Sequence, residues 1–231
     1  KGQYTYRKIL DEVIISDIID SDTYDEIYSQ YRFNAGTADY TVGLHSFSDD
    51  SLLVFNRNSI HTVQNTVNLQ GSVVKLLTNE VGCVARKSIV QVGNQVIFLS
   101  DNGVYGTQFM DEYNLRGTET PLSEPINETI NRINKDHWEE SRAVYFDNRY
   151  YIAVPLNYTN SAGIVVEPQR NNAILIFNFL NAQWESVDMV ADATGDINPD
   201  WDVENLIVAG SGAARGVYAI NQLGGIHKLD T

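Results

Sequence analysis

Four oxygen-bearing side chains alternate along one short stretch of the chain and could together bind a divalent cation. They are Asp196, Asn198, Asp200 and Asp202. An EF-hand loop supplies oxygen ligands to calcium from alternate positions, but it also requires Gly at its sixth position and Glu at its twelfth. This chain has Trp201 and Ile207 there. We therefore favour a solvated acidic loop, keep calcium as the alternative, and expect no other cofactor.

The histidines do not form a recognisable catalytic or metal-binding motif. They are His45, His61, His137 and His227, and none stands at a metal-ligand spacing from another. The sequence contains neither a G-x-S-x-G nucleophile elbow nor a G-x-G-x-x-G phosphate loop. Spacing nominates no pair of carboxylates for glycoside hydrolysis. We therefore expect a protein that is not an enzyme, although a triad assembled in space cannot be read from a sequence.

The single cysteine, Cys83, rules out an internal disulfide and a multi-cysteine metal site within this sequence. Its neighbours Val81 and Val84 are apolar. We therefore expect Cys83 to be a small buried hydrophobic residue rather than a reactive thiol.

Two similar stretches indicate the elements that position these residues. SLLVFNRNSIHTV at residues 51–63 returns in altered form as QVIFLSDNGVYGT at residues 95–107. Each joins a β-branched and aromatic run to a second, shorter run through an Asn, Asp or Gly turn, which predicts a β-hairpin. A repeated hairpin cannot bury its own apolar face, so neighbouring copies must cover one another. The repeat predicts an all-β fold, a β-propeller.

The number of blades follows from aligning the strongest apolar run of each repeat. The aligned residues are Phe55, Phe98, Ile152 and Tyr218. The first spacing falls within the roughly 40–50 residues of a four-stranded blade. We therefore expect about four blades, which either close on themselves or form part of a larger propeller. Because the sequence opens with Lys1 in the middle of a pattern, we interpret it as a piece of a longer polypeptide.

The expected organisation is a lead-in followed by interrupted blades. Residues 1–50 form an irregular lead-in with the first outer strands, and residues 51–231 form the blades. Insertions interrupt the blades at residues 109–137, 157–172 and 188–204. Within the first insertion, Ser123 is a plausible N-cap and apolar residues follow at helical spacing, which predicts one short helix over residues 122–135.

These insertions are where we expect contacts with other proteins, because insertions on one face of a repeat fold often carry binding. The candidate interface residues are Ile126, Ile130, Ile133, Tyr158 and Trp201.

Composition excludes several classes of protein. The net charge of −14 argues against wrapping of nucleic acid, because phosphate binding requires clustered Lys and Arg. No stretch approaches the roughly 20 apolar residues that span a bilayer. Hydrophobic content of 43% is typical of a globular protein and argues against general disorder.

An ordered set of strings gives the chain a resemblance to a known family. They are SDTYD and FNAG within residues 16–36, LLVFNRNSI at 52–60, GCVARKSIV at 82–90, VIFLSDNGVY at 96–105 and PLSEPI at 121–126. Together they resemble the β-propeller tail hub, or nozzle, proteins of tailed bacteriophages, which are packaged-DNA stabilisation proteins. The resemblance extends from Tyr4 to about Val187.

The resemblance implies a structural part of the virion tail that is made in the host cytoplasm. Such proteins form rings, commonly hexamers, which surround or extend the DNA exit channel. Their implied partners are the portal or adaptor protein and the tail fibre, while DNA passes without specific binding. An acidic surface fits this role because it repels the DNA backbone.

A second function class stays open on sequence grounds. Aromatic pairs at residues 145–146 and 150–151, with Trp138 and Trp184, could form the floor of a sugar site, although such residues more often pack in the core of a strand-rich chain. The alternative is therefore a β-propeller that binds or degrades glycans.

Overall fold

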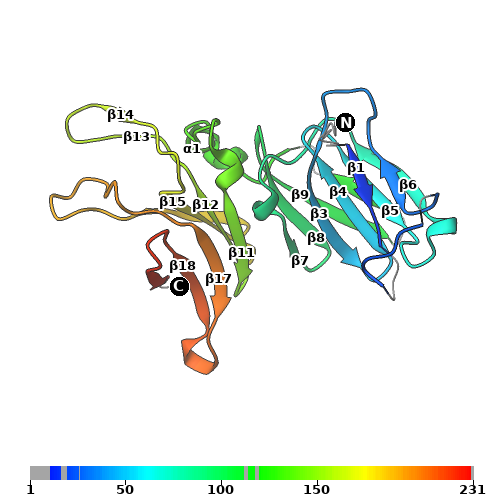
Figure 1. Ribbon diagram of the computed structural model, residues 1–231. Coiled ribbons are helices and arrows are strands. Elements are labelled where there is room, and N and C mark those ends of the chain that lie inside the picture. Colours follow the sequence, from blue (N-terminus) through cyan, green and yellow to red (C-terminus); the bar gives the residue numbers. More distant parts are fainter. Residues whose placement is uncertain (1–10, 17–19, 26, 112–113, 118–119, 230–231) are drawn as a thin grey trace, which may run out of the picture. The chain divides into compact units, whose positions relative to one another are not determined.

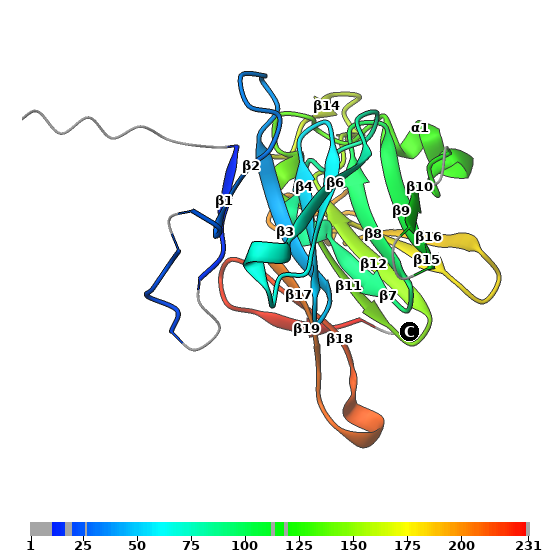
Figure 2. The ribbon, with the colours of Figure 1, turned by 90° about the vertical axis from the view of Figure 1, so that its right-hand side faces the viewer.

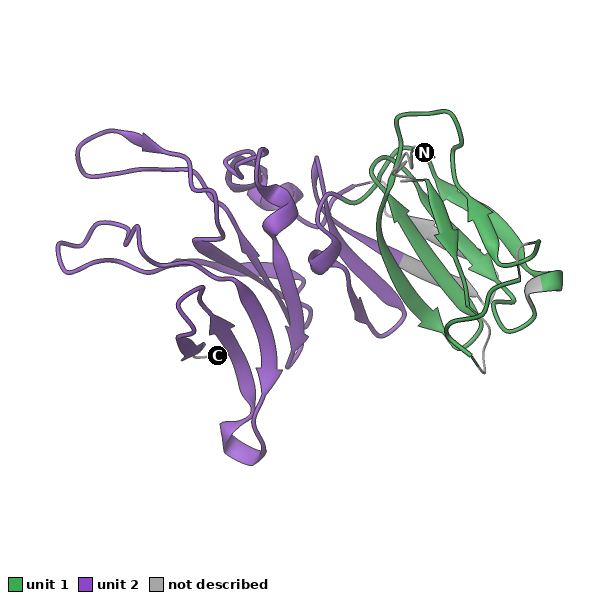
Figure 3. Cartoon of the chain, viewed as in Figure 1, with its two compact units in different colours: residues 1–83 green, residues 84–231 purple. Residues whose placement is uncertain are grey.

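The computed structural model describes the chain except residues 1–10, 17–19, 26, 112–113, 118–119 and 230–231. The chain divides into two compact units, residues 1–83 and residues 84–231 (Figure 3). Each unit consists mainly of antiparallel sheets, which confirms the predicted all-β fold.

The first unit contains one four-stranded sheet and one small two-stranded sheet. The large sheet joins its strands in chain order: β3 (Thr41–Ser48), β4 (Ser51–Asn56), β5 (Ile60–Gln64) and β6 (Val73–Thr78). The small sheet pairs β1 (Glu12–Ile14) with β2 (Gln30–Arg32). A 3-10 turn, η1 (Leu69–Gly71), follows β5. The expected lead-in thus contributes β1, β2 and β3.

The β1–β2 pair covers one face of the large sheet. Val13, Tyr31 and Phe33 pack against Val54 of β4 and Val63 of β5 in one buried cluster. Successive residues of a strand point to opposite faces, so Leu53 and Phe55 of β4 point away from this cluster, and both are fully buried.

A polar network fixes the turn between β4 and β5. The carboxylate of Asp39 accepts hydrogen bonds from Asn34 Nδ2 at 2.7 Å, from Ser59 Oγ at 2.6 Å and from the backbone N–H of Asn58 at 2.8 Å. Asn56 Nδ2 donates to Ser59 Oγ at 3.0 Å. The network gives the strings FNAG and LLVFNRNSI a structural role, because they supply four of its residues: Asn34, Asn56, Asn58 and Ser59.

His61 lies beside this network on β5. Its ring packs against that of Phe33, with centroids 5.0 Å apart, and its Nδ1 lies 3.4 Å from Asn56 Nδ2. Burial lowers the pKa of His61, while the charge of Asp39 acts in the opposite direction. The folded unit therefore favours the neutral ring.

The second unit contains three further sheets of three or four strands, each ordered as a meander, and one two-stranded sheet (Figures 1 and 2). The first contains β7 (Val90–Val92), β8 (Gln95–Ser100), β9 (Gly103–Asp111) and β10 (Asn114–Gly117). The second contains β11 (Arg142–Phe146), β12 (Arg149–Val154), β15 (Ala173–Asn178) and β16 (Gln183–Met189). The third contains β17 (Asn205–Ala209), β18 (Gly216–Ile220) and β19 (Ile226–Lys228). Short 3-10 turns are η2 (Arg86–Ser88), η4 (Trp138–Glu140) and η5 (Gly212–Ala214).

The blade repeat predicted from the sequence is confirmed. Phe55, Phe98, Ile152 and Tyr218 fall on β4, β8, β12 and β18, the second strand of each meander sheet. Both predicted hairpins form, with Phe55 opposite Ile60 and Phe98 opposite Tyr105.

The β11–β12–β15–β16 sheet is buried on both faces in its centre. Tyr150, Ile152 and Val154 of β12 pack on one face with Ile97 and Leu99 of the β7–β10 sheet. The residues between them, Tyr151 and Ala153, pack on the other face with residues of β17 and β18. Because neither face meets water, β12 and β15 are nearly continuous apolar runs instead of alternating ones. This is the packing expected of successive blades.

The predicted helix over residues 122–135 is only partly correct. Helical structure is limited to η3 (Glu124–Ile126) and α1 (Asn127–Ile130). After α1 the chain leaves the helix because Ile133 forms a β-bridge with Leu156, and Asn134 N–H donates to Pro155 O at 2.8 Å. Tertiary pairing here overrides the helical spacing of the isoleucines.

Ser123 is the N-cap residue of η3, as predicted, but its side chain does not form the capping bond. Its Oγ caps no helical N–H and instead accepts a hydrogen bond from the backbone N–H of Val104 at 2.9 Å. Gly103 makes this contact possible, because a Cβ at that position would lie 2.2 Å from Ser123 Oγ.

Cys83 is buried, as predicted. It follows Gly82, whose missing side chain lets the chain lie directly against Arg57. A Cβ at Gly82 would lie 2.3 Å from that residue's carbonyl carbon and oxygen. The GCVARKSIV string thus begins with a position that only glycine can occupy.

Candidate functional site

Two long loops extend from the same end of the β11–β12–β15–β16 sheet (Figure 1). The first, residues 157–172, connects β12 to β15 and contains a small hairpin of β13 (Tyr158–Thr159) and β14 (Val165–Val166). The second, residues 190–204, connects β16 to β17. Both fall within insertions predicted from the sequence.

The tips of the two loops are joined. Asp196 Oδ2 accepts hydrogen bonds from the backbone N–H of Ser161 at 3.1 Å and from its hydroxyl at 2.9 Å. Within the second loop, Asp192 Oδ1 accepts bonds from Thr194 and from the backbone N–H of Asp196. These donors lower the pKa of both carboxyls, through Thr194 for Asp192 and through Ser161 for Asp196. The loops therefore hold each other in place.

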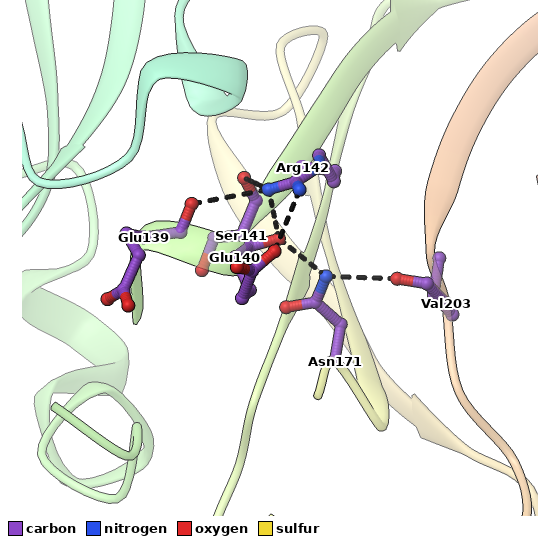
Figure 4. A network of polar contacts seen from close by, with 6 residues as sticks. All are labelled: Glu139, Glu140, Ser141, Arg142, Asn171 and Val203. Atoms are coloured by element: carbon purple, nitrogen blue, oxygen red, sulfur yellow. Dashed lines mark hydrogen bonds and ion pairs between the residues drawn. The ribbon is translucent and has the colours of Figure 1, made fainter. Parts of the chain in front are cut away.

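A second set of contacts fixes the base of the loops (Figure 4). Asn171 Nδ2 donates to Glu140 O at 2.7 Å and to Val203 O at 2.9 Å, while Val203 N–H donates to Asn171 O at 2.8 Å. One amide side chain thus links the first loop to the second and to the turn before β11.

A buried arginine holds that turn. The Arg142 guanidinium donates to the backbone carbonyls of Glu139, Glu140 and Ser141, and to Glu140 Oε2 at 2.8 Å. Its side chain is only 9% exposed, so this charge is held by the protein rather than presented to a ligand. Sequence reasoning missed Arg142 and Asn171. The only available signal was an arginine at the start of an otherwise apolar strand.

Between the tips and the base lie two adjoining pockets that share Gln169, Arg170 and Asp202. We call them together the loop groove. The larger pocket has a volume of about 650 Å³, and the smaller about 320 Å³. The larger one mixes apolar and polar side chains, among them Tyr158, Pro168, Pro199, Asp200, Trp201 and Leu223. The smaller one is more polar and includes His137, Glu140, Asn171 and Glu204.

The carboxylates of the loop groove differ in their partners. Asp202 pairs with Arg170 at 3.0 Å and also accepts the backbone N–H of Gln222 at 2.9 Å. Asp200 and Glu204 are exposed, and neither forms an ion pair within the described part of the chain. Within the described part of the chain, the carboxylates of Asp200 and Glu204 therefore have no cationic side chain to neutralise them.

The four residues considered for calcium do not meet at one point. Asp196 binds Ser161, Asn198 Oδ1 accepts the backbone N–H of Asp200, and Asp202 binds Arg170. Among the described residues, no three His, Cys, Asp or Glu side chains form a group that could hold a metal ion. The alternation in the sequence places these residues in a loop without turning their oxygens toward a common centre.

The five interface candidates occupy two different settings. Ile130 and Ile133 are each 5% exposed and belong to the core between the β7–β8–β9–β10 sheet and the β11–β12–β15–β16 sheet. Ile126 packs against that core. Tyr158 and Trp201 line the loop groove. Tyr158 is itself buried, which raises the pKa of its hydroxyl, as do the nearby Asp196 and Asp192.

The histidines are dispersed, as their spacing suggested. His61 is buried in the first unit, His137 lines the smaller pocket, and the ring of His227 meets that of Trp201 edge to face at 4.9 Å. His45 lies on β3. In the described residues, no helix is long and apolar enough to cross a membrane.

Comparison with known families finds a match to most of this chain. The model of the family described as bacteriophage P22 Gp10, beta-propeller, matches residues 1–154. The match ends at the last residue of β12, so both loops of the groove follow it in the sequence. A search of curated proteins finds no match.

Proposed function

Because this chain belongs to the family of the bacteriophage P22 Gp10 β-propeller, and is thus a phage structural protein, we propose that it is a non-enzymatic part of the virion tail. In this role it is a hub or nozzle subunit, which forms a ring around or beyond the DNA exit channel and docks other tail proteins. The family match over residues 1–154 is the observation that carries the proposal.

The charge of the chain supports a conduit role. A net charge of −14 gives a surface that repels the phosphate backbone, so DNA would slide past without being held. The joined loops support a docking role, because a pair of loops fixed at both tip and base presents a preorganised surface to a partner.

Mass photometry and negative-stain electron microscopy of the purified protein test the proposal. We expect a single oligomeric species, such as a hexamer, that appears as a ring with a central channel. Incorporation into virions is expected to be lost when residues 157–172 are replaced by a short turn. A protein that stays monomeric at every concentration, or that assembles and docks normally without this loop, would contradict the proposal.

One observation favours a second candidate, a glycan-binding propeller. Trp201 lines the larger pocket beside the amide side chains of Asn198 and Gln222, and an aromatic ring beside polar groups can stack on a sugar. A monomer that binds or cleaves oligosaccharides would favour this candidate over the tail protein.

A further inference from the structure

We propose that the loop groove binds an extended basic segment of another virion protein, with Lys or Arg side chains on either side of an apolar residue. The inference rests on the proposed function, since it assigns a site and a partner chemistry to the docking role. Three features of the groove lead to it: its charge, its apolar wall and an unpaired acceptor.

The charge of the groove selects a cation. The second loop, residues 190–204, includes five acidic residues and no Lys or Arg: Asp192, Asp196, Asp200, Asp202 and Glu204. Of the three that line the groove, Asp202 is neutralised by Arg170, whereas Asp200 and Glu204 have no ion-pair partner in the described residues. Asp200 lines the larger pocket and Glu204 the smaller one. Two separated cationic side chains suit this arrangement better than one metal ion, for which the described residues provide no cluster.

The wall of the larger pocket selects an apolar residue between those cations. Pro168 of the first loop faces the groove together with Pro199 and Trp201 of the second loop, and Leu223 in the β18–β19 turn is 90% exposed. Large apolar side chains left in water at the edge of a pocket are typical of an interface without its partner. An apolar side chain of the partner would be covered by these groups.

The smaller pocket carries an acceptor without a donor. Asn171 is 2% exposed and lines this pocket, and its Oδ1 is buried without a hydrogen-bond partner among the described residues. Its Nδ2 is already committed to the carbonyls of Glu140 and Val203, so the amide cannot turn to satisfy the oxygen (Figure 4). Buried acceptors are nearly always paired, and a backbone or side-chain N–H of a basic segment would supply the missing donor.

Fluorescence anisotropy with two labelled peptides tests the proposal on the full chain. The probe is a short synthetic peptide in which Arg and Lys flank a Leu-Pro pair, and its twin carries Glu in place of each basic residue. We expect the basic peptide to bind and the acidic twin not to bind. Binding of the basic peptide should also weaken as salt is raised.

A pair of double variants locates the binding. Asp200→Asn with Glu204→Gln should weaken binding of the basic peptide by about tenfold or more. Glu128→Gln with Asp188→Asn changes the net charge equally at exposed positions that do not line the groove, and should change the affinity by less than about twofold.

Three results would overturn the proposal: equal binding of both peptides, equal weakening by both double variants, or binding of a neutral maltooligosaccharide where the basic peptide does not bind. Mass photometry of the same samples separates this failure from that of the proposed function. If the protein forms rings but does not bind the basic peptide, only the groove assignment is contradicted. If the protein is a monomer, the proposed tail role itself is contradicted.

Discussion

Two polar regions of the molecule look alike in the sequence and differ in the structure. The network at the turn between β4 and β5 contains Asp39, Asn56 and Asn58, and the loop before β17 likewise contains Asp and Asn side chains. In the first, the Asp39 carboxylate takes three hydrogen bonds from the chain. In the second, Asp200 and Glu204 extend into a groove without an ion-pair partner among the described residues.

The difference shows how a polar cluster divides between folding and recognition. A carboxylate whose oxygens are all paired within the chain contributes to stability and has little left for a partner. A carboxylate that contacts only water contributes little to folding stability, and its charge remains available to bind a ligand. The predictions that follow test this division, from the largest expected effect to the smallest.

Asp39→Ala should lower the free energy of unfolding by about 2–3 kcal/mol, because three donors around the turn lose a charged acceptor. Urea denaturation measures the change. Asp49→Ala, at an exposed turn position between β3 and β4, is the matched control and should change stability by less than about 0.5 kcal/mol. An Asp39 variant as stable as this control would mean that the network does not support the fold.

The first unit should lose stability as the pH falls through the histidine range. Burial lowers the pKa of His61 below its ordinary value of 6.5, so the unfolded chain binds a proton before the folded one does. The stabilising contribution is complete above that ordinary value and declines below it, toward the pKa of the folded state. Thermal melts between about pH 7.5 and pH 5.5 should show this decline.

His61→Gln should flatten that part of the pH profile, since a glutamine does not titrate. His227→Gln, at an exposed position on β19, should leave the profile as it is. If both variants keep the wild-type slope, another group controls the acid sensitivity.

Ser161→Ala should loosen the loop tips without unfolding either unit. The variant removes the hydroxyl donor to Asp196 but keeps the backbone N–H donor. Amide hydrogen exchange in residues 190–198 should become about threefold faster, while the melting temperature stays nearly constant. Lowering the pH should also speed exchange, but only at low pH. The pKa of Asp196 is lowered, so its hydrogen bonds to Ser161 are lost only when the pH falls through this lowered pKa. Unchanged exchange would show that the tips are held by other contacts.

Asp200→Asn with Glu204→Gln should have the smallest effect on folding, within about 0.5 kcal/mol in urea denaturation. Both carboxylates are exposed and unpaired in the described chain, so no native ion pair is lost. A loss as large as that of Asp39→Ala would remove the distinction between the two regions.

The blades could be predicted because their signal is local and repeated. The runs at Phe55, Phe98 and Ile152 each combine β-branched or aromatic residues with a turn, and each forms the second strand of a sheet. Helical spacing at Ile126, Ile130 and Ile133 was a weaker guide. The bridge between Ile133 and Leu156 joins segments distant in the sequence, and no local pattern reports it.

The candidate site could be predicted only in part. Interruptions of the blade repeat pointed to both loops, and Tyr158 and Trp201 do line the groove between them. The alternation from Asp196 to Asp202 left calcium as the alternative to a solvated loop, and in the structure Asp196 binds Ser161 while Asp202 binds Arg170. Which carboxylates stay unpaired depends on contacts between the two loops, and spacing along the chain contains no information about them.

The attachment of the first loop has a mechanical consequence. Residues 157–172 connect β12 to β15, and each of these strands is hydrogen-bonded to neighbours on both of its edges. A pull on the loop, parallel to the strands, would load these hydrogen bonds together in shear instead of breaking them one after another. A protein attached there would transmit tension into the β11–β12–β15–β16 sheet, whose centre is buried on both faces.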